Sequence, residues 1–153
     1  MKLALMINGG LRIEPESSLD WNVLRCIVYD AAPDNLASRL ASVIDDPSGD
    51  WQEFVLPELE ATFSRQLMQV REMIEHGAGR SAENKGTIEI LPDQADLWYG
   101  ALNQARLALE EQHRFGGNEP PPPTDSPERR SAFFRSQFYF EIQQVLISRV
   151  MKP

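Results

Sequence analysis

The stretch TIEILPDQADLWYGALNQARLALEEQHR, residues 87–114, decides the fold. Its first residues, Thr87 to Leu91, are of β-type and predict a short strand. Pro92 and Asp93 then open a helix, because proline fits a first helical turn and an acidic side chain there suits the helix dipole. An apolar stripe at helical spacing predicts that this helix continues to about residue 114. The stripe consists of Trp98, Leu102, Ala105 and Leu109.

The N-terminal segment predicts a β-hairpin followed by a helix. Residues 2–7 and 11–14 are short apolar runs that flank Asn8-Gly9-Gly10. Asparagine and glycine tolerate the positive φ that a tight hairpin turn requires. Pro15 blocks further strand pairing, and a serine shortly after it can cap a helix that runs to about Ala31.

Two more helices are expected in the middle of the chain. A short one restarts after Pro33 and stops at Asp45–Gly49, where turn residues gather. A longer one begins near Asp50 or at Pro57, since proline fits a first turn but would kink a helix from inside. The segment His76–Ser81, which holds two glycines, is expected to end it and to lead into a polar loop.

The last third of the chain predicts a linker and a final helix. Residues 116–127 form a proline-rich linker that contains four consecutive prolines. The helix that follows, Glu128 to Met151, is rich in aromatic residues, and its apolar side chains occupy more than one face. It therefore lies centrally in a bundle, or it buries a second face against a partner or another copy of the chain.

A weak internal repeat supports one fold class. Leu11-x-Ile13-x-Pro15-Glu16 with Trp21 resembles Ile88-x-Ile90-x-Pro92-Asp93 with Trp98. If the repeat is real, the later strand pairs with the hairpin. The fold class is then mostly α (α+β): a bundle of four to five helices with a small antiparallel β element formed by the N-terminal hairpin and one later strand. We expect a single helical domain over residues 1–153, with the linker inside it.

Length and composition limit the possible protein classes. The chain has 153 residues, which is typical of one domain. No apolar run approaches the roughly 20 residues of a membrane helix, and the apolar N-terminus is too short for a signal peptide. Cys26 cannot form an internal disulfide, since it is the one cysteine in the chain, and is expected to be a buried thiol. These features predict a cytoplasmic protein that does not bind membranes.

Two regions are candidates for protein interaction. Asn103 and Arg106 lie three residues apart beside Trp98, on a helix otherwise rich in alanine and leucine. The arginine fork suits a carboxylate within the fold or across an interface; alternatively, Arg106 pairs with Glu110 one turn on. The aromatic last helix, through residues such as Phe138 and Tyr139, is the second candidate.

The sequence gives little support for a catalytic or a metal-binding function. The sequence has no glycine-rich phosphate loop and no nucleophile elbow, so we expect no catalytic residues and no cofactor. Glu110 and His113 lie three apart on one helix face, as in carboxylate-bridged metal sites, but such sites take further ligands from other helices. A metal-dependent enzyme using these two residues is kept as a minor alternative, and we expect no metal.

Nucleic-acid binding would need a local basic patch. The net charge is −8, which repels phosphate backbones at long range. Arg129, Arg130 and Arg135, near the start of the last helix, form the one candidate patch. Arginines beside Glu128 can equally make a solvated helix face. A transcriptional regulator that contacts nucleic acid through this patch is therefore the alternative, not the leading hypothesis.

The pattern DxxxxWxxALNxxRLxL at residues 93–109 resembles an uncharacterised bacterial family, number two-thousand-and-seventeen among the domains of unknown function. The pattern WxEFxxPxL at residues 51–59 and the N-terminal hairpin are also similar to it. The resemblance implies no established reaction. Some family members carry a label as transcriptional regulators. In actinobacteria the family's genes often lie beside that of the adaptor that delivers substrates to the Clp protease, which suggests a role in proteolysis.

The sequence leads to one main hypothesis about function. We expect a non-enzymatic, cytoplasmic regulator or adaptor that binds another protein or itself, with a possible homodimer through the last helix and a possible link to Clp-type proteolysis. The candidate interaction residues are Trp98, Asn103, Arg106, Phe138 and Tyr139.

Overall fold

The computed structural model describes residues 1–31, 48–84 and 86–151. The helix expected between Pro33 and Asp45 lies outside these residues. The described helices are α1 (Ser18–Ala31), α3 (Leu56–Asn84), α4 (Ala95–His113) and α5 (Pro127–Val145), with a 3₁₀ turn at Pro92–Gln94 and π-helical turns at Trp51–Val55 and Leu146–Val150. The expected mostly α fold with a small antiparallel β element is confirmed. Within the described part of the chain, no helix is long and apolar enough to cross a membrane.

Three strands form an antiparallel sheet in the order β1 (Lys2–Leu5), β2 (Leu11–Glu14) and β3 (Ile88–Ile90). The expected hairpin joins β1 to β2. Gly9 adopts a φ of 89° in its turn, which glycine tolerates and most residues do not. The expected pairing of the later strand with the hairpin is also confirmed, because β3 lies against β2.

The register between β2 and β3 is symmetrical about one residue pair. Arg12 lies opposite Glu89, and Leu11 and Ile13 lie opposite Ile90 and Ile88. In the repeat, Leu11 corresponds to Ile88 and Ile13 to Ile90. The pairing is therefore that of two equivalent strands related by an approximate twofold axis. The helices that follow the two strands, α1 and α4, pack on each other.

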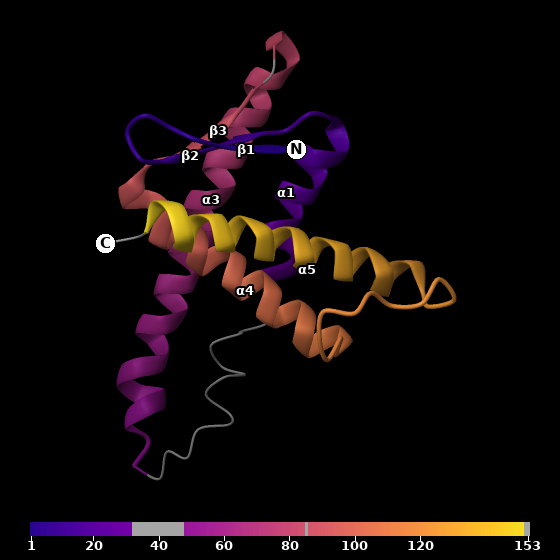
Figure 1. The fold of residues 1–153 in the computed structure, drawn as a ribbon. Helices are drawn as coiled ribbons and strands as arrows, with labels where there is room; N and C mark the ends of the chain where they lie inside the picture. The colour runs from indigo at the N-terminus through magenta and orange to yellow at the C-terminus, as the bar shows by residue number, and fades with distance from the viewer. Residues whose placement is uncertain (32–47, 85, 152–153) are drawn as a thin grey trace.

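The helices bury a core against one side of this sheet. Figure 1 shows α5 lying across α4, the sheet at one end, and the first half of α3 extending beyond the other helices. Alternate residues of β2 point inward, so Leu11 and Ile13 are completely buried. Trp98 of α4 and Tyr139 of α5 are also completely buried and are the largest such side chains. The apolar stripe of α4 and the aromatic helix α5 thus meet in one core.

The extent of α3 differs from the prediction. Of the two predicted starts, the one near Asp50 is correct, because a π-helical turn at Trp51–Val55 leads directly into α3. The helix then passes through His76–Ser81 and ends at Asn84. The sequence predicts a helix end at the two glycines, but Gly77 instead allows a close contact. A Cβ atom there would lie 2.8 Å from the carbonyl oxygen of Thr87 and 3.1 Å from the Trp21 ring. Gly77 is thus required by the passage of the chain into β3.

Specific residues cap the C-terminal end of α4 and the N-terminal end of α5. Arg114, not a glycine, takes the left-handed conformation that ends α4, with a φ of 50°. The linker contains a turn in which the Asp125 amide donates to the Pro122 carbonyl at 2.9 Å. Ser126 then caps α5 by accepting a hydrogen bond from the Arg129 amide at 3.1 Å, as serine commonly does at a helix start.

Candidate protein-interaction groove

A groove with a volume of about 570 Å³ lies between α1 and α5. Leu19, Val23 and Cys26 line it from α1, at the i, i+4, i+7 spacing that puts side chains on one helix face. Ser131, Phe134 and Phe138 line it from α5 at a similar spacing, and Met1, Asp20, Asn22 and Arg135 complete the lining. We call these ten residues the α1–α5 groove. Its walls are largely apolar side chains.

Two large apolar side chains stand exposed on opposite walls of the α1–α5 groove. Phe134 on α5 is 73% exposed, and Leu19 on α1 is 67% exposed. Exposed apolar residues that occur singly are ordinary, but their grouping around a concave surface is typical of a binding site. The arrangement offers a partner both a cavity and two apolar contact points beside it.

A buried ion pair joins the two walls. The Arg135 guanidinium donates from Nε to Asp30 Oδ2 at 2.8 Å and from Nη2 to Asp30 Oδ1 at 3.0 Å. The Asp30 side chain is only 2% exposed. Because the contact is bidentate, it fixes the orientation of both side chains. This pair therefore holds α1 and α5 at a defined separation, and the groove exists before any partner arrives.

Tyr139 completes this buried cluster. Its hydroxyl donates to Asp30 Oδ2 at 2.8 Å. Burial, and then the charge of Asp30, raises the pKa of Tyr139 well above its ordinary range. The hydrogen bond with Asp30 similarly raises the pKa of Arg135. Both groups keep their protons, so the cluster serves to hold the helices together and is unsuited to proton transfer near neutral pH.

Cys26 lines the groove as a protonated thiol. Burial, followed by the nearby charge of Asp30, raises the pKa of Cys26. The thiolate is the reactive form of cysteine, so this environment disfavours nucleophilic or redox chemistry. Cys26 is half-buried rather than fully buried as the sequence suggested. It acts as a small apolar side chain in the groove wall.

The formal charges at the groove are compensated by ion pairs within the chain. Asp20 lies 3.3 Å from the amino group of Met1, which also lies 2.9 Å from Glu16. Arg135 is paired with Asp30. Each charged group that lines the groove thus has an opposite charge beside it. A partner meets an apolar surface with little net charge, although the chain as a whole carries −8.

Arg106 lies between α4 and α5, outside the groove. Its Nη1 donates to Gln143 Oε1 at 2.8 Å, and its guanidinium lies 4.6 Å from the centre of the Phe140 ring. Its Nε is buried and has no partner among the described residues. Burial lowers the pKa of Arg106. Through these contacts Arg106 connects α4 to α5. Asn103, on the same helix as Arg106, is half-buried.

Two of the predicted interaction residues belong to the core. Trp98 and Tyr139 are completely buried. The Trp98 indole donates to the sulfur of Met73 at 3.2 Å. A partner of the folded domain would not touch either side chain, which corrects their assignment to a surface. Phe138 is half-buried and lines the groove, so it remains a candidate.

The three arginines of the candidate nucleic-acid patch, the alternative hypothesis, make contacts within the chain. Arg129 pairs with Asp125 and donates to the carbonyls of His113 at 3.1 Å and Arg114 at 3.2 Å. Arg130 donates to the Asp125 carbonyl at 3.2 Å. Arg129 thus satisfies carbonyl groups at the end of α4, which a cation stabilises. These roles explain the arginines without a phosphate ligand.

Glu110 and His113, the minor alternative for a metal site, help to end α4. Glu110 accepts a hydrogen bond from the Gly116 amide at 3.0 Å. The His113 ring stacks on Phe115, with the ring centres 5.5 Å apart. Within residues 1–31, 48–84 and 86–151, no group of three or more histidine, cysteine, aspartate or glutamate side chains is placed to hold a metal ion.

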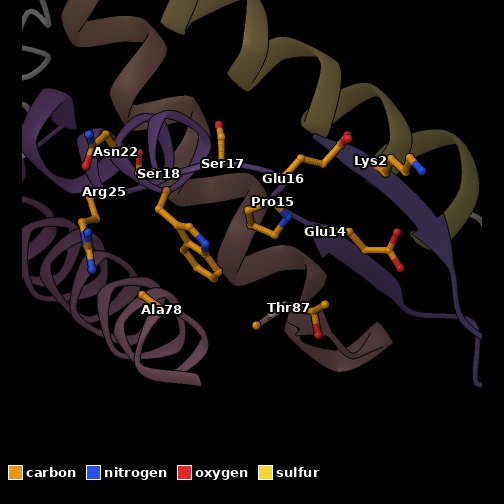
Figure 2. A pocket seen from close by; sticks show the side chains of 12 residues that line it. Lys2, Glu14, Pro15, Glu16, Ser17, Ser18, Asn22, Arg25, Ala78 and Thr87 are labelled. Atoms are coloured by element: carbon orange, nitrogen blue, oxygen red, sulfur yellow. The ribbon is translucent and has the colours of Figure 1, made fainter. Parts of the chain in front are cut away.

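A second cleft lies where the sheet meets the start of α1 and the end of α3. Its volume is about 820 Å³. Figure 2 shows Lys2 and Glu14 at one end and Asn22 and Arg25 at the other. Charges of both signs face the cleft, and Arg25 pairs with Glu75 at 2.9 Å. This lining of mixed charge favours no single ligand charge.

Sequence reasoning missed Asp30, Leu19 and Phe134. Asp30 carried a signal that could have identified it, because an acidic residue near the end of a helix opposes the helix dipole and needs a compensating partner. Phe134 belongs to the aromatic run of the last helix, but periodicity alone did not separate it from Phe133, which is buried. The separation depends on where α5 packs.

Comparison with known proteins identifies the family. The model of the family described as Domain of unknown function (DUF2017) matches residues 9–150. The match includes β2, β3 and every described helix, and it confirms the resemblance carried by residues 51–59 and 93–109. No curated protein and no solved structure matches the chain. The chain therefore belongs to the DUF2017 family.

Proposed function

We propose that this protein is a non-enzymatic, cytoplasmic regulator or adaptor that binds another protein through the α1–α5 groove. The observation that carries the proposal is the exposure of Phe134 beside a groove held open by the Asp30–Arg135 pair. Aromatic anchors next to preformed apolar pockets supply most of the binding energy in protein interfaces. A groove that is fixed in advance also avoids the entropic cost of ordering on binding.

An amphipathic helix suits the shape and chemistry of the groove. Two roughly facing helix walls with apolar side chains at i, i+3, i+4 and i+7 spacing accept a third helix through its own apolar stripe. Cys26 and Tyr139 are held in their protonated forms by burial and by Asp30, so binding is better supported here than catalysis. We extend the proposal to Clp-type proteolysis as the biological setting, on the strength of the family resemblance alone.

Affinity co-purification from a native lysate, read by mass spectrometry, tests the proposal. The baits are the full chain, Phe134→Glu in the groove, and Phe54→Glu as a matched control. Phe54 is also a largely exposed phenylalanine, 62% accessible, in the π-helical turn before α3. We expect a protein that the wild-type chain and Phe54→Glu capture and that Phe134→Glu does not.

The captured protein is then purified and titrated against the same three chains. We expect at least a tenfold weaker affinity for Phe134→Glu, as for loss of a central aromatic anchor. A capture profile that is identical for all three baits, or the absence of any specific protein, would contradict the proposed function.

A further inference from the structure

We propose that a second copy of this chain occupies the α1–α5 groove, with the two copies related by a twofold axis and Phe134 of each copy inserted into the groove of the other. The inference rests on the proposed function, because it names an occupant of the same groove. It makes the free protein a dimer in which each copy covers the other's binding surface.

The groove and the side chain that would fill it belong to one patch. A twofold contact requires a surface that is complementary to itself, because each residue of the patch meets the same patch on the other copy. Phe134 projects from the groove wall and is 73% exposed, while the groove beside it has a volume of about 570 Å³. Leu19, 67% exposed on the opposite wall, provides a second apolar contact point. One patch thus supplies both the projecting ring and the cavity.

The distribution of charge favours a second copy over a basic partner. Two copies of a chain with a net charge of −8 repel each other, so self-association requires a surface where that charge is compensated. The α1–α5 groove meets this requirement, because Asp20 is paired with the Met1 amino group and Arg135 with Asp30. A basic partner would instead gain from an acidic lining, which the groove does not offer.

The size of the patch predicts a weak dimer. Phenylalanine buries about 150–250 Å² on complete burial, and a stable interface requires about 800 Å² from each partner. Two aromatic anchors, one from each copy, together supply only about 300–500 Å², which is well below that size. We therefore expect a dimer that dissociates on dilution. A third protein that binds the same groove would then compete with self-association.

Sedimentation equilibrium of the full chain over a wide concentration series tests this inference. The chains are the wild type, the groove variants Phe134→Glu and Leu19→Glu, and Phe54→Glu as the matched aromatic control. Each replaced side chain is largely exposed, so all variants should fold, which circular dichroism checks. We expect a monomer–dimer equilibrium for the wild type and Phe54→Glu, and monomers for both groove variants at every concentration.

Three results would overturn the inference: a wild-type chain that stays monomeric throughout, a dimer that persists in both groove variants, or an assembly larger than a dimer. The outcomes also separate this inference from the proposed function. A monomeric wild type that still captures a different protein through Phe134 removes the dimer and keeps the function. A dimer that depends on Phe134, with no captured protein in the lysate, supports the inference and removes the function.

Discussion

Asp30 and Arg135 lie 105 residues apart in the sequence, and the guanidinium of Arg135 donates to both carboxylate oxygens of Asp30, at 2.8 and 3.0 Å. This contact connects the end of α1 to the first half of α5. It defines the spacing of the two helices that form the groove. The stability of the domain and the shape of its candidate binding surface therefore depend on the same pair.

Asp30→Asn should destabilise the domain by about 3 kcal/mol, because it leaves Arg135 partly buried without its counter-charge. Urea denaturation followed by circular dichroism measures the effect. Glu75→Gln is the matched control, since it breaks the exposed Arg25–Glu75 pair and should cost less than about 1 kcal/mol. Equal effects of the two substitutions would show that the buried pair contributes no more than a surface pair.

Tyr139→Phe should remove the hydrogen bond to Asp30 while keeping the ring in the core. Hydrogen bonds to charged groups contribute about 1.5–3 kcal/mol, and we expect a loss of that order in the free energy of unfolding. The substitutions Tyr139→Phe and Asp30→Asn should be non-additive in a double-mutant cycle, because their side chains touch. Additive effects would contradict a direct interaction between Tyr139 and Asp30.

The raised pKa of Tyr139 predicts a dependence of stability on alkaline pH. In the unfolded chain its hydroxyl loses a proton near the ordinary value of 10.0, whereas in the folded protein burial and Asp30 keep it protonated. Its contribution to stability is therefore complete below pH 10 and decreases as the pH rises above that value. The free energy of unfolding should fall less steeply in this range for Tyr139→Phe than for the wild type; parallel pH profiles would refute this assignment.

Arg106→Ala should act on stability and not on binding. It removes the hydrogen bond to Gln143 and the contact with Phe140, and we expect a loss of about 1–2 kcal/mol. The same variant used as a bait should still capture the partner that Phe134→Glu loses. If capture is lost while the free energy of unfolding is unchanged, Arg106 belongs to the interface after all.

Gly77→Ala and Gly79→Ala should have opposite effects on stability. A Cβ atom at Gly77 would lie 2.8 Å from the Thr87 carbonyl oxygen, and one at Gly79 would have no neighbour within 4 Å. We expect Gly77→Ala to cost about 1–3 kcal/mol through overpacking and Gly79→Ala to stabilise α3 by about 0.5–1 kcal/mol. Thermal unfolding of the two variants measures both effects, and a destabilised Gly79→Ala would contradict a helical position there.

The secondary structure was predictable wherever the signal was local. The hairpin at Asn8-Gly9-Gly10, the helix from Ser18 to Ala31 and the start of α4 after Pro92 depend on turn residues, caps and apolar spacing within a few positions. The prediction of the end of α3 was wrong, because the local propensity of glycine favours a helix end at Gly77. Its actual role depends on Thr87 and Trp21, which lie outside α3.

The candidate site was much less predictable than the fold. Tryptophan and tyrosine are residue types that are common at interfaces, and yet Trp98 and Tyr139 are both completely buried. Phe134, in the same aromatic helix as Tyr139, is exposed. A helix with apolar residues on more than one face does not reveal which face the core takes. That choice depends on where α1 and α4 lie against α5, which no periodicity within α5 encodes.

The amino-acid sequence by itself determined the hairpin, the strand–proline–helix repeat, the family and the mostly helical class, because each rests on interactions between residues close in the chain or on a pattern of residue types. The tertiary structure alone decided the pairing of Asp30 with Arg135, the contact that requires Gly77, and the groove beside Phe134. The physical reason is that a groove and a buried charge pair are properties of two surfaces brought together. Their energies depend on distance and burial, and neither quantity exists until distant segments pack.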